Sequence, residues 1–160
     1  MDDALEQLLE TWRTNDRINL FLIDRISDQG MAATLSKRGG RTVARQFAHL
    51  HNQRVYHLQG RTRALADGLA KIDGKAQPGK AELKRALTAS GDGIAAFLEQ
   101  AVTGAGAGTL RPFKKGIVAN LAYLIAHESH HRGSILLTLK QCGHKLDKAA
   151  QGAIGNWDKM

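Results

Sequence analysis

Apolar residues recur at helical spacing in four long segments of this chain, and this pattern constrains the fold more than any other feature of the sequence. The segments span residues 2–27, 42–70, 80–102 and 113–142. No segment shows the apolar–polar alternation of a half-buried strand. Because an apolar stripe on each of several long helices has to be buried against other helices, the sequence predicts an all-α fold, and specifically a four-helix bundle.

Turn-forming residues separate these segments and mark their ends. Residues 73–80 and the glycine-rich residues 103–112 are expected to be loops, and a third loop is expected across residues 30–40. The glycine run lacks the Gly-Lys-Ser/Thr ending of a phosphate-binding loop and follows no strand. Thr42 is expected to cap the start of the second helix, and Gly143 is expected to end the fourth.

The length of 160 residues suits one domain with its own core and is too short for two, so we expect a single domain over residues 1–160. No run of about 18 or more apolar residues occurs, which predicts no membrane span. The acidic residues 1–6 lack the pattern of a secretory signal, and Cys142 is the single cysteine. Both features favour a cytoplasmic protein.

The formal net charge of +8 raises the question of a polyanionic partner such as nucleic acid. The basic residues are scattered, and the densest group is Lys37, Arg38, Arg41 and Arg45. No aromatic residues interleave with this group, as a stacking platform for bases would require. The sequence therefore indicates a surface with a basic bias and does not favour nucleic-acid binding.

The strongest functional signal is Ala-His-Glu-Ser-His-His-Arg-Gly at residues 126–133. Because each helical residue turns the side-chain direction by about 100°, His127 and His131 are neighbours on one face and can converge on one ion. We place this face within the buried stripe of its helix. Two buried imidazoles need either a metal ion or a hydrogen-bond network to satisfy them. The spacing favours the metal and leaves the network as an alternative.

A third metal ligand has to come from another helix, and residues 47–57 offer three histidines. His49 has polar neighbours on its own flank that can hold a ligand in place. His51 falls toward the other edge, and His57 lies near the apolar side and equally suits a position in the core or at an interface. Spacing alone therefore gives His49 only a slight preference over the other two.

Residues 127–131 also match His-Glu-x-x-His, the zinc-binding helix of metalloproteases, in which the glutamate activates water. The surrounding sequence does not fit, because no glutamate follows Glu128 and Ser134 stands where the extended motif has glycine. No strand is expected that could bind an extended peptide. We therefore do not favour a protease, and we expect Glu128 to be solvated or to support the histidines.

Two stretches of the chain resemble the DinB/YfiT-like family. Residues 42–50, Thr-Val-Ala-Arg-Gln-Phe-Ala-His-Leu, resemble its second helix. Residues 127–136, His-Glu-Ser-His-His-Arg-Gly-Ser-Ile-Leu, resemble its His-x-x-x-His-Arg-Gly-Gln helix. Residues 139–144 and Trp157 also fit, so the resemblance extends over nearly the whole chain.

The resemblance implies an up-down-down-up four-helix bundle in which His49, His127 and His131 bind one divalent metal ion, for which we expect zinc or nickel. Ser134 replaces the family's frequent glutamine, and His130 is an extra histidine that flanks the motif. The resemblance also implies a homodimer. The apolar content of the first and fourth segments, which exceeds what one helix seam needs, agrees with that expectation.

Some members of this family use low-molecular-weight thiols, which implies a thiol-dependent S-transferase with a small-molecule substrate. A metal ion held by three neutral imidazoles keeps its full charge and an open position for water or a thiolate. Cys142 lies beyond the histidine pair and off its face, so no protein nucleophile is expected. A metal-dependent hydrolase and a non-catalytic metal-binding module of a stress response are the two alternatives.

Overall fold

The computed structural model describes residues 3–160, and all regular structure in that range is helical. The α-helices are α1 (Asp3–Arg25), α2 (Asp28–Ala32), α3 (Val43–Leu58), α4 (Lys80–Thr103), α5 (Ile117–Gln141) and α6 (Lys148–Gly155). Two short 3-10 helices, η1 (Arg63–Ala66) and η2 (Trp157–Lys159), complete the set. The prediction of an all-α fold is confirmed. None of the described helices is long and apolar enough to cross a lipid bilayer.

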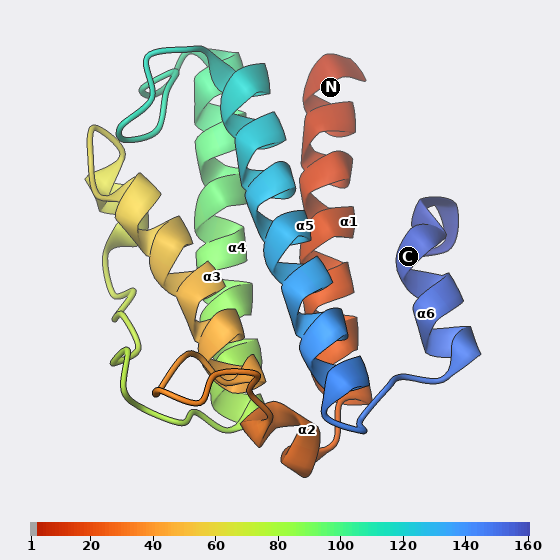
Figure 1. Ribbon diagram of the computed structural model, residues 1–160. Helices are drawn as coiled ribbons and strands as arrows, with labels where there is room; N and C mark the ends of the chain where they lie inside the picture. The colour runs from red at the N-terminus through yellow and green to blue at the C-terminus, as the bar shows by residue number, and fades with distance from the viewer. Residues whose placement is uncertain (1–2) are drawn as a thin grey trace.

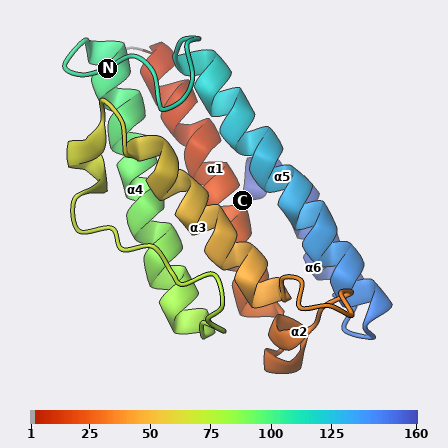
Figure 2. The ribbon, with the colours of Figure 1, turned by 60° about the vertical axis from the view of Figure 1, so that its left-hand side comes forward.

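Four long helices, α1, α3, α4 and α5, lie side by side and contain most of the described chain (Figure 1). α1 packs against α4 and α5, and α3 packs against the same two helices from the other side. In the view of Figure 1, α1 and α5 descend while α3 and α4 rise. The turned view of Figure 2 places α3 in front, with α4 on one side and α5 on the other.

Two helix ends are set by the capping residues that the sequence predicted, Thr42 and Gly143. The hydroxyl of Thr42 accepts a hydrogen bond from the backbone N–H of Arg45, which satisfies a free donor in the first turn of α3. Gly143 follows α5 with φ of 80°, a left-handed conformation that favours glycine. Gly104 ends α4 in the same way, with φ of 72°.

The second helix is shorter than predicted, because α3 ends at Leu58 and not near residue 70. The backbone N–H of Gly60 and the hydroxyl of Thr62 both donate to the carbonyl of Leu58, which a continuing helix would use for its own ladder. Residues 59–79 are therefore a connection that contains only η1. The expected loop over residues 30–40 also begins later than predicted, since α2 occupies its first part.

The remaining boundaries differ from the predictions by a few residues. The first helix ends at Arg25, and its predicted start at Asp2 lies outside the described residues. The fourth helix begins at Ile117. The C-terminal segment packs against the core through Ile154, whereas Trp157 stays 39% exposed.

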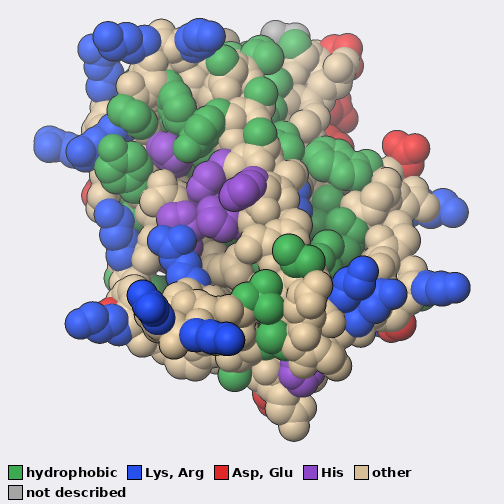
Figure 3. All heavy atoms as spheres, in the orientation of Figure 1, with side chains coloured by type: hydrophobic (Ala, Val, Ile, Leu, Met, Phe, Trp, Pro, Cys, Tyr) green, Lys and Arg blue, Asp and Glu red, His purple; other side chains and the backbone are tan. Residues whose placement is uncertain are grey.

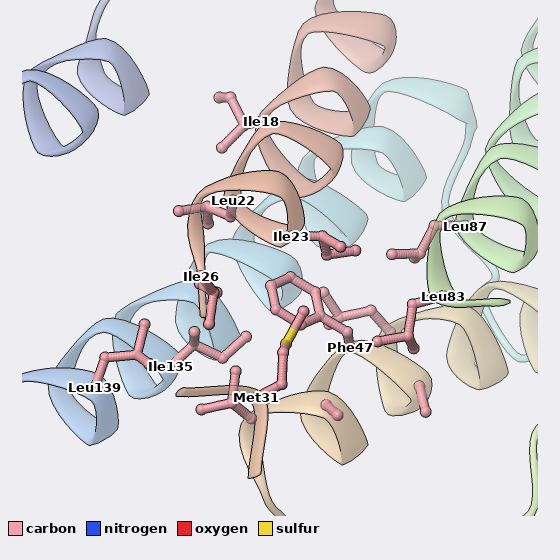
Figure 4. Packing of buried hydrophobic residues seen from close by; sticks show 14 of the residues in the cluster. Ile18, Leu22, Ile23, Ile26, Met31, Phe47, Leu83, Leu87, Ile135 and Leu139 are labelled. Atoms are coloured by element: carbon pink, nitrogen blue, oxygen red, sulfur yellow. The ribbon is translucent and has the colours of Figure 1, made fainter. Parts of the chain in front are cut away.

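Two apolar clusters form the core, one toward each end of the long helices. The first contains Phe47 of α3, Ile23 of α1 and Met31 of α2, which converge in Figure 4. The second contains Trp12 of α1 and Phe97 of α4. All five side chains are at most 5% exposed. Burial of these clusters supplies the main driving force for packing the helices.

A buried polar layer separates the two apolar clusters. Glu128 of α5 is 1% exposed, and its carboxylate accepts hydrogen bonds from Nε and Nη2 of Arg54 at 2.6 and 2.9 Å. The side-chain amides of Asn15 and Asn19 donate to the same carboxylate, each at 2.7 Å. Nη1 of Arg54 donates to Asp16 at 2.6 Å and to the carbonyl of Leu87 in α4 at 2.9 Å. This layer therefore joins all four long helices.

Opposing influences act on the ionisation of Glu128. Burial by itself raises the pKa of this carboxyl, but the charge of Arg54 and its hydrogen bonds outweigh burial, so the pKa lies below the ordinary value. Glu128 is therefore ionised at neutral pH and forms a salt bridge with Arg54.

We predict that Glu128→Ala destabilises the fold by about 3–5 kcal/mol, because it leaves the Arg54 guanidinium buried without its main partner. Denaturant unfolding of the metal-free protein measures this loss. The matched control is Glu99→Ala in α4, whose side chain is exposed, and its effect should stay within about 0.5 kcal/mol. A loss below about 1 kcal/mol for Glu128→Ala would show that the polar layer does not hold the helices together.

Candidate metal centre

Three histidines meet on the surface where α3 packs against α5. One ring nitrogen of His49, one of His127 and one of His131 lie within 4.8 Å of one another. The ring centroid of His131 lies 4.7 Å from that of His49 and 4.7 Å from that of His127. All three side chains are partly exposed. The fold thus brings together the three histidines that the resemblance singled out.

The position of the histidines on α5 differs from the prediction. We placed His127 and His131 within the buried stripe of the helix, but Glu128 and Arg132 occupy it, at 1% and 5% exposure. His127 and His131 lie one residue earlier in each case and therefore on the flank that faces α3. The physical reason is the pairing of Glu128 with Arg54, which allows a carboxylate to be buried.

The three imidazoles are neutral at physiological pH. Burial lowers the pKa of His49 and of His131 to about 4, and the nearby charge of Arg41 and the neighbouring imidazoles act in the same direction. Burial also lowers the pKa of His127. Because only a neutral imidazole has a free lone pair for a metal ion, the site is already in its binding form at pH 7.

Glu128 cannot serve as the water-activating glutamate of a metalloprotease. Its carboxylate lies inside the polar layer, where Arg54, Asn15 and Asn19 use its oxygens. The expectation of a solvated Glu128 is therefore wrong. The described part of the chain also lacks a strand that could bind an extended peptide.

The other histidines near this site differ from the group of three. His51 is buried, and its two ring nitrogens contact the hydroxyl of Ser90 at 3.1 Å and the carbonyl of Ala70 at 2.9 Å. His130 is exposed and lies outside the group, although its ring centroid is 5.4 Å from that of His131. Neither histidine belongs to the group of three, and the expectation that they are not ligands stays a prediction.

An aromatic group borders the site next to His127. The ring of Tyr123 stacks on His127 with a centroid distance of 5.8 Å and an interplanar angle of 10°. Phe113 and His57 contact the same tyrosine at 4.6 and 5.6 Å. His57 contacts the carbonyl of Arg111 at 2.7 Å through Nδ1, which must therefore be the donor. Nε2 of His57 is buried and has no hydrogen-bond partner among the described residues. Sequence reasoning did not single out these aromatic neighbours.

The surface around the histidines has two different sides. In Figure 3 the histidine side chains gather in one patch, with hydrophobic side chains on one side and Lys and Arg side chains on the other. On the basic side, a pocket of about 300 Å³ opens beside His131. A smaller pocket of about 90 Å³ opens beside His49, and Arg41 lines both. A larger hollow of about 940 Å³ between α1 and the C-terminal residues borders none of these histidines.

The comparison with protein families supports the resemblance over part of the chain. The model of the DinB family matches residues 117–151, which contain α5 and the beginning of α6. The resemblance is confirmed there, and the matched segment includes His127 and His131 but not His49. No curated protein and no solved structure matches the chain.

We predict that His49→Ala, His127→Ala and His131→Ala each weaken binding of zinc or nickel by at least about tenfold, because each removes one of three converging donors. Elemental analysis after equimolar loading and desalting measures the retained metal, in protein purified without a histidine tag. His130→Ala is the control, since this exposed histidine of α5 lies outside the group, and it should retain wild-type metal. Full metal occupancy in His49→Ala would show that α3 contributes no ligand to the site.

The lowered pKa values predict a pH dependence for the metal-free protein. His49 and His131 have pKa values of about 4 in the folded chain, and about 6.5 is normal for an unfolded chain. The unfolded state therefore binds more protons, so stability is highest above about pH 6.5 and falls as the pH drops toward about 4. Denaturant unfolding at several pH values measures this dependence. The free energy of unfolding should fall less with decreasing pH in the double variant His49→Gln, His131→Gln than in the wild type. An equal loss of stability in the double variant would show that the lowered pKa values of these two histidines are not its cause.

Proposed function

We propose that this protein binds one divalent metal ion through His49, His127 and His131 and leaves a coordination position open to a small molecule. The convergence of three neutral, partly exposed imidazoles is the observation that carries this proposal. Imidazole suits zinc and nickel, and three protein ligands with an open position are typical of catalytic zinc sites. The family match over α5 supports the same interpretation.

The proposal includes the up-down-down-up four-helix bundle of DinB-like proteins. The directions of the four long helices in Figure 1 and the contacts of α1 and α3 with both α4 and α5 support it. It also includes a homodimer. Val118 and Leu137 of α5, which are 67% and 52% exposed, provide apolar surface for a second subunit.

The reaction that we propose is transfer to the sulfur of a small thiol. A bound divalent ion would supply positive charge that lowers the pKa of a thiol or water beside it. The thiol loses its proton to solvent, and its sulfur attacks an electrophilic carbon. The S–C bond forms while the leaving group departs with its electron pair. His49, His127 and His131 would hold the ion, and the ring of Tyr123 stacked on His127 covers that ligand on one side.

The thiol has to come from outside the protein. Cys142 is the only thiol in the chain, and it lies one residue beyond the end of α5. Its Sγ lies 3.6 Å from the carbonyl of Thr34, to which the thiol can donate. This position is more than two helical turns from His131 along α5, which supports an external nucleophile.

We predict that metal-loaded protein couples a small thiol to 1-chloro-2,4-dinitrobenzene and that turnover requires both the metal and the thiol. Absorbance of the thioether product measures the rate. Cys142→Ser should retain the wild-type rate, whereas His131→Ala should lose at least about tenfold in rate because the metal is lost. Several thiols and electrophiles of different size and charge are screened in the same way.

Two outcomes would assign the site to an alternative. Consumption of the electrophile without thiol would indicate a metal-dependent hydrolase, since water would then be the nucleophile. No turnover with any pair, in protein whose metal content is full, would indicate a non-catalytic metal-binding module. A module of this kind would act in a stress response by binding a partner and not by converting a substrate.

A further inference from the structure

A polar pocket adjoins the candidate metal centre on its basic side. The pocket has a volume of about 300 Å³, and its lining includes Thr34, Arg41, Gln46, His131, Ser134 and Thr138. We name it the Arg41 pocket. Because His131 forms part of its wall, a small molecule bound there lies next to the three histidines.

Gln46 contributes a polar side chain to the wall of this pocket. The residue as a whole is 7% exposed, and its side-chain amide makes no hydrogen bond to any described residue. The buried side chains Asn120 and Arg54, in contrast, are fully engaged by other groups of the protein. The amide atoms of Gln46 are not among the fully buried polar atoms that lack a partner, so solvent reaches them and they can hydrogen-bond a ligand that enters the pocket.

Arg41 brings a positive charge to the same space. It lies just before α3 and lines both the Arg41 pocket and the smaller pocket beside His49. Its side chain is exposed and forms no ion pair with any carboxylate of residues 3–160. The guanidinium is therefore free to bind an anion from solution.

The surrounding charges favour an anion over a neutral molecule. Among residues 3–160, no carboxylate lines the Arg41 pocket. The nearest acidic residue on α5, Glu128, is neutralised by Arg54. Three neutral imidazoles would leave the full charge of a bound divalent ion uncompensated beside Arg41. A ligand that brings one negative charge offsets this excess.

We propose that the Arg41 pocket binds the carboxylate of the small molecule that reaches the metal position. This inference rests on the proposed function, because the reactive end of that molecule lies at the three histidines. The planar guanidinium of Arg41 matches a carboxylate in shape and charge, and the amide of Gln46 donates to the same group. The substrate class is thus a small carboxylic acid whose other end carries the thiol or the electrophile.

The first test uses metal-free protein and propionate, so that it does not depend on the metal. Side-chain NMR signals of Arg41 Nε–H and the Gln46 amide are followed during titration with propionate, with propionamide as the neutral comparison. We expect saturable shifts of both signals with propionate and none with propionamide, and we expect Arg41→Ala to abolish the shift of the Gln46 amide signal. The control is Arg38→Ala, an exposed arginine of the same loop that does not line the pocket. Absence of saturable shifts at high millimolar propionate overturns the proposal, as does binding of inorganic phosphate in place of propionate.

The second test uses cobalt-loaded protein and two thiols of equal length, 3-mercaptopropionate and 3-mercaptopropionamide. The absorption band of a thiolate bound to cobalt reports binding. We expect the carboxylate to bind at least about tenfold more tightly, as one charge-assisted pair allows. Arg41→Ala should reduce the preference for the carboxylate thiol to about twofold or less. Gln46→Leu should also reduce this preference, because it removes the amide that donates to the carboxylate.

The two proposals fail in different ways in these tests. Cobalt content is measured first, and wild-type protein that takes up no metal refutes the proposed function, while the propionate titration still decides on the pocket. Full cobalt content with equal affinity for both thiols overturns the pocket proposal and leaves the metal site intact. A preference that persists unchanged in Arg41→Ala also overturns it.

Discussion

The buried ion pair between Arg54 and Glu128 is the interaction on which the arrangement of the long helices depends. The carboxylate takes hydrogen bonds from α1 and α3, and the guanidinium reaches Asp16 of α1 and the carbonyl of Leu87 in α4. Because an unpaired buried charge costs several kcal/mol, sliding or rotation of one helix is opposed by the loss of this pair. The two apolar clusters supply most of the burial, and the polar layer between them sets the register.

The same layer positions the candidate metal centre. Glu128 and Arg132 are four residues apart and face inward, and His127 and His131 repeat that spacing one residue earlier. A rotation of about 100° between adjacent residues therefore places the histidine pair beside α3 once the charged pair is buried. On α3, His49 lies five residues before Arg54, so the pair that holds α3 against α5 also brings the third imidazole to the site.

Much of the fold follows from local patterns, whereas the burial of Glu128 does not. Apolar spacing indicates the four long helices, and Thr42 and Gly143 mark two of their ends because capping depends on neighbouring residues. Glu128 has its decisive partner 74 residues away, so a helical pattern treats it as solvated. The end of α3 was missed for a related reason: Leu65 and Leu69 continue the apolar pattern, but they pack on the second cluster from the connection that follows the helix.

The motif from His127 to His131 can be interpreted only when it is known which of its side chains are buried. In a metalloprotease the glutamate has to reach the water on the metal, so it must share the open side of the helix with the histidines. Here Arg132 follows the second histidine directly and lies in the same buried stripe as Glu128, four residues away. An arginine at that position favours an inward glutamate, because the two charges then face the same interior. The histidines therefore stay on the open side of α5, while Glu128 stays inside the bundle and is not available to them as an acid or base.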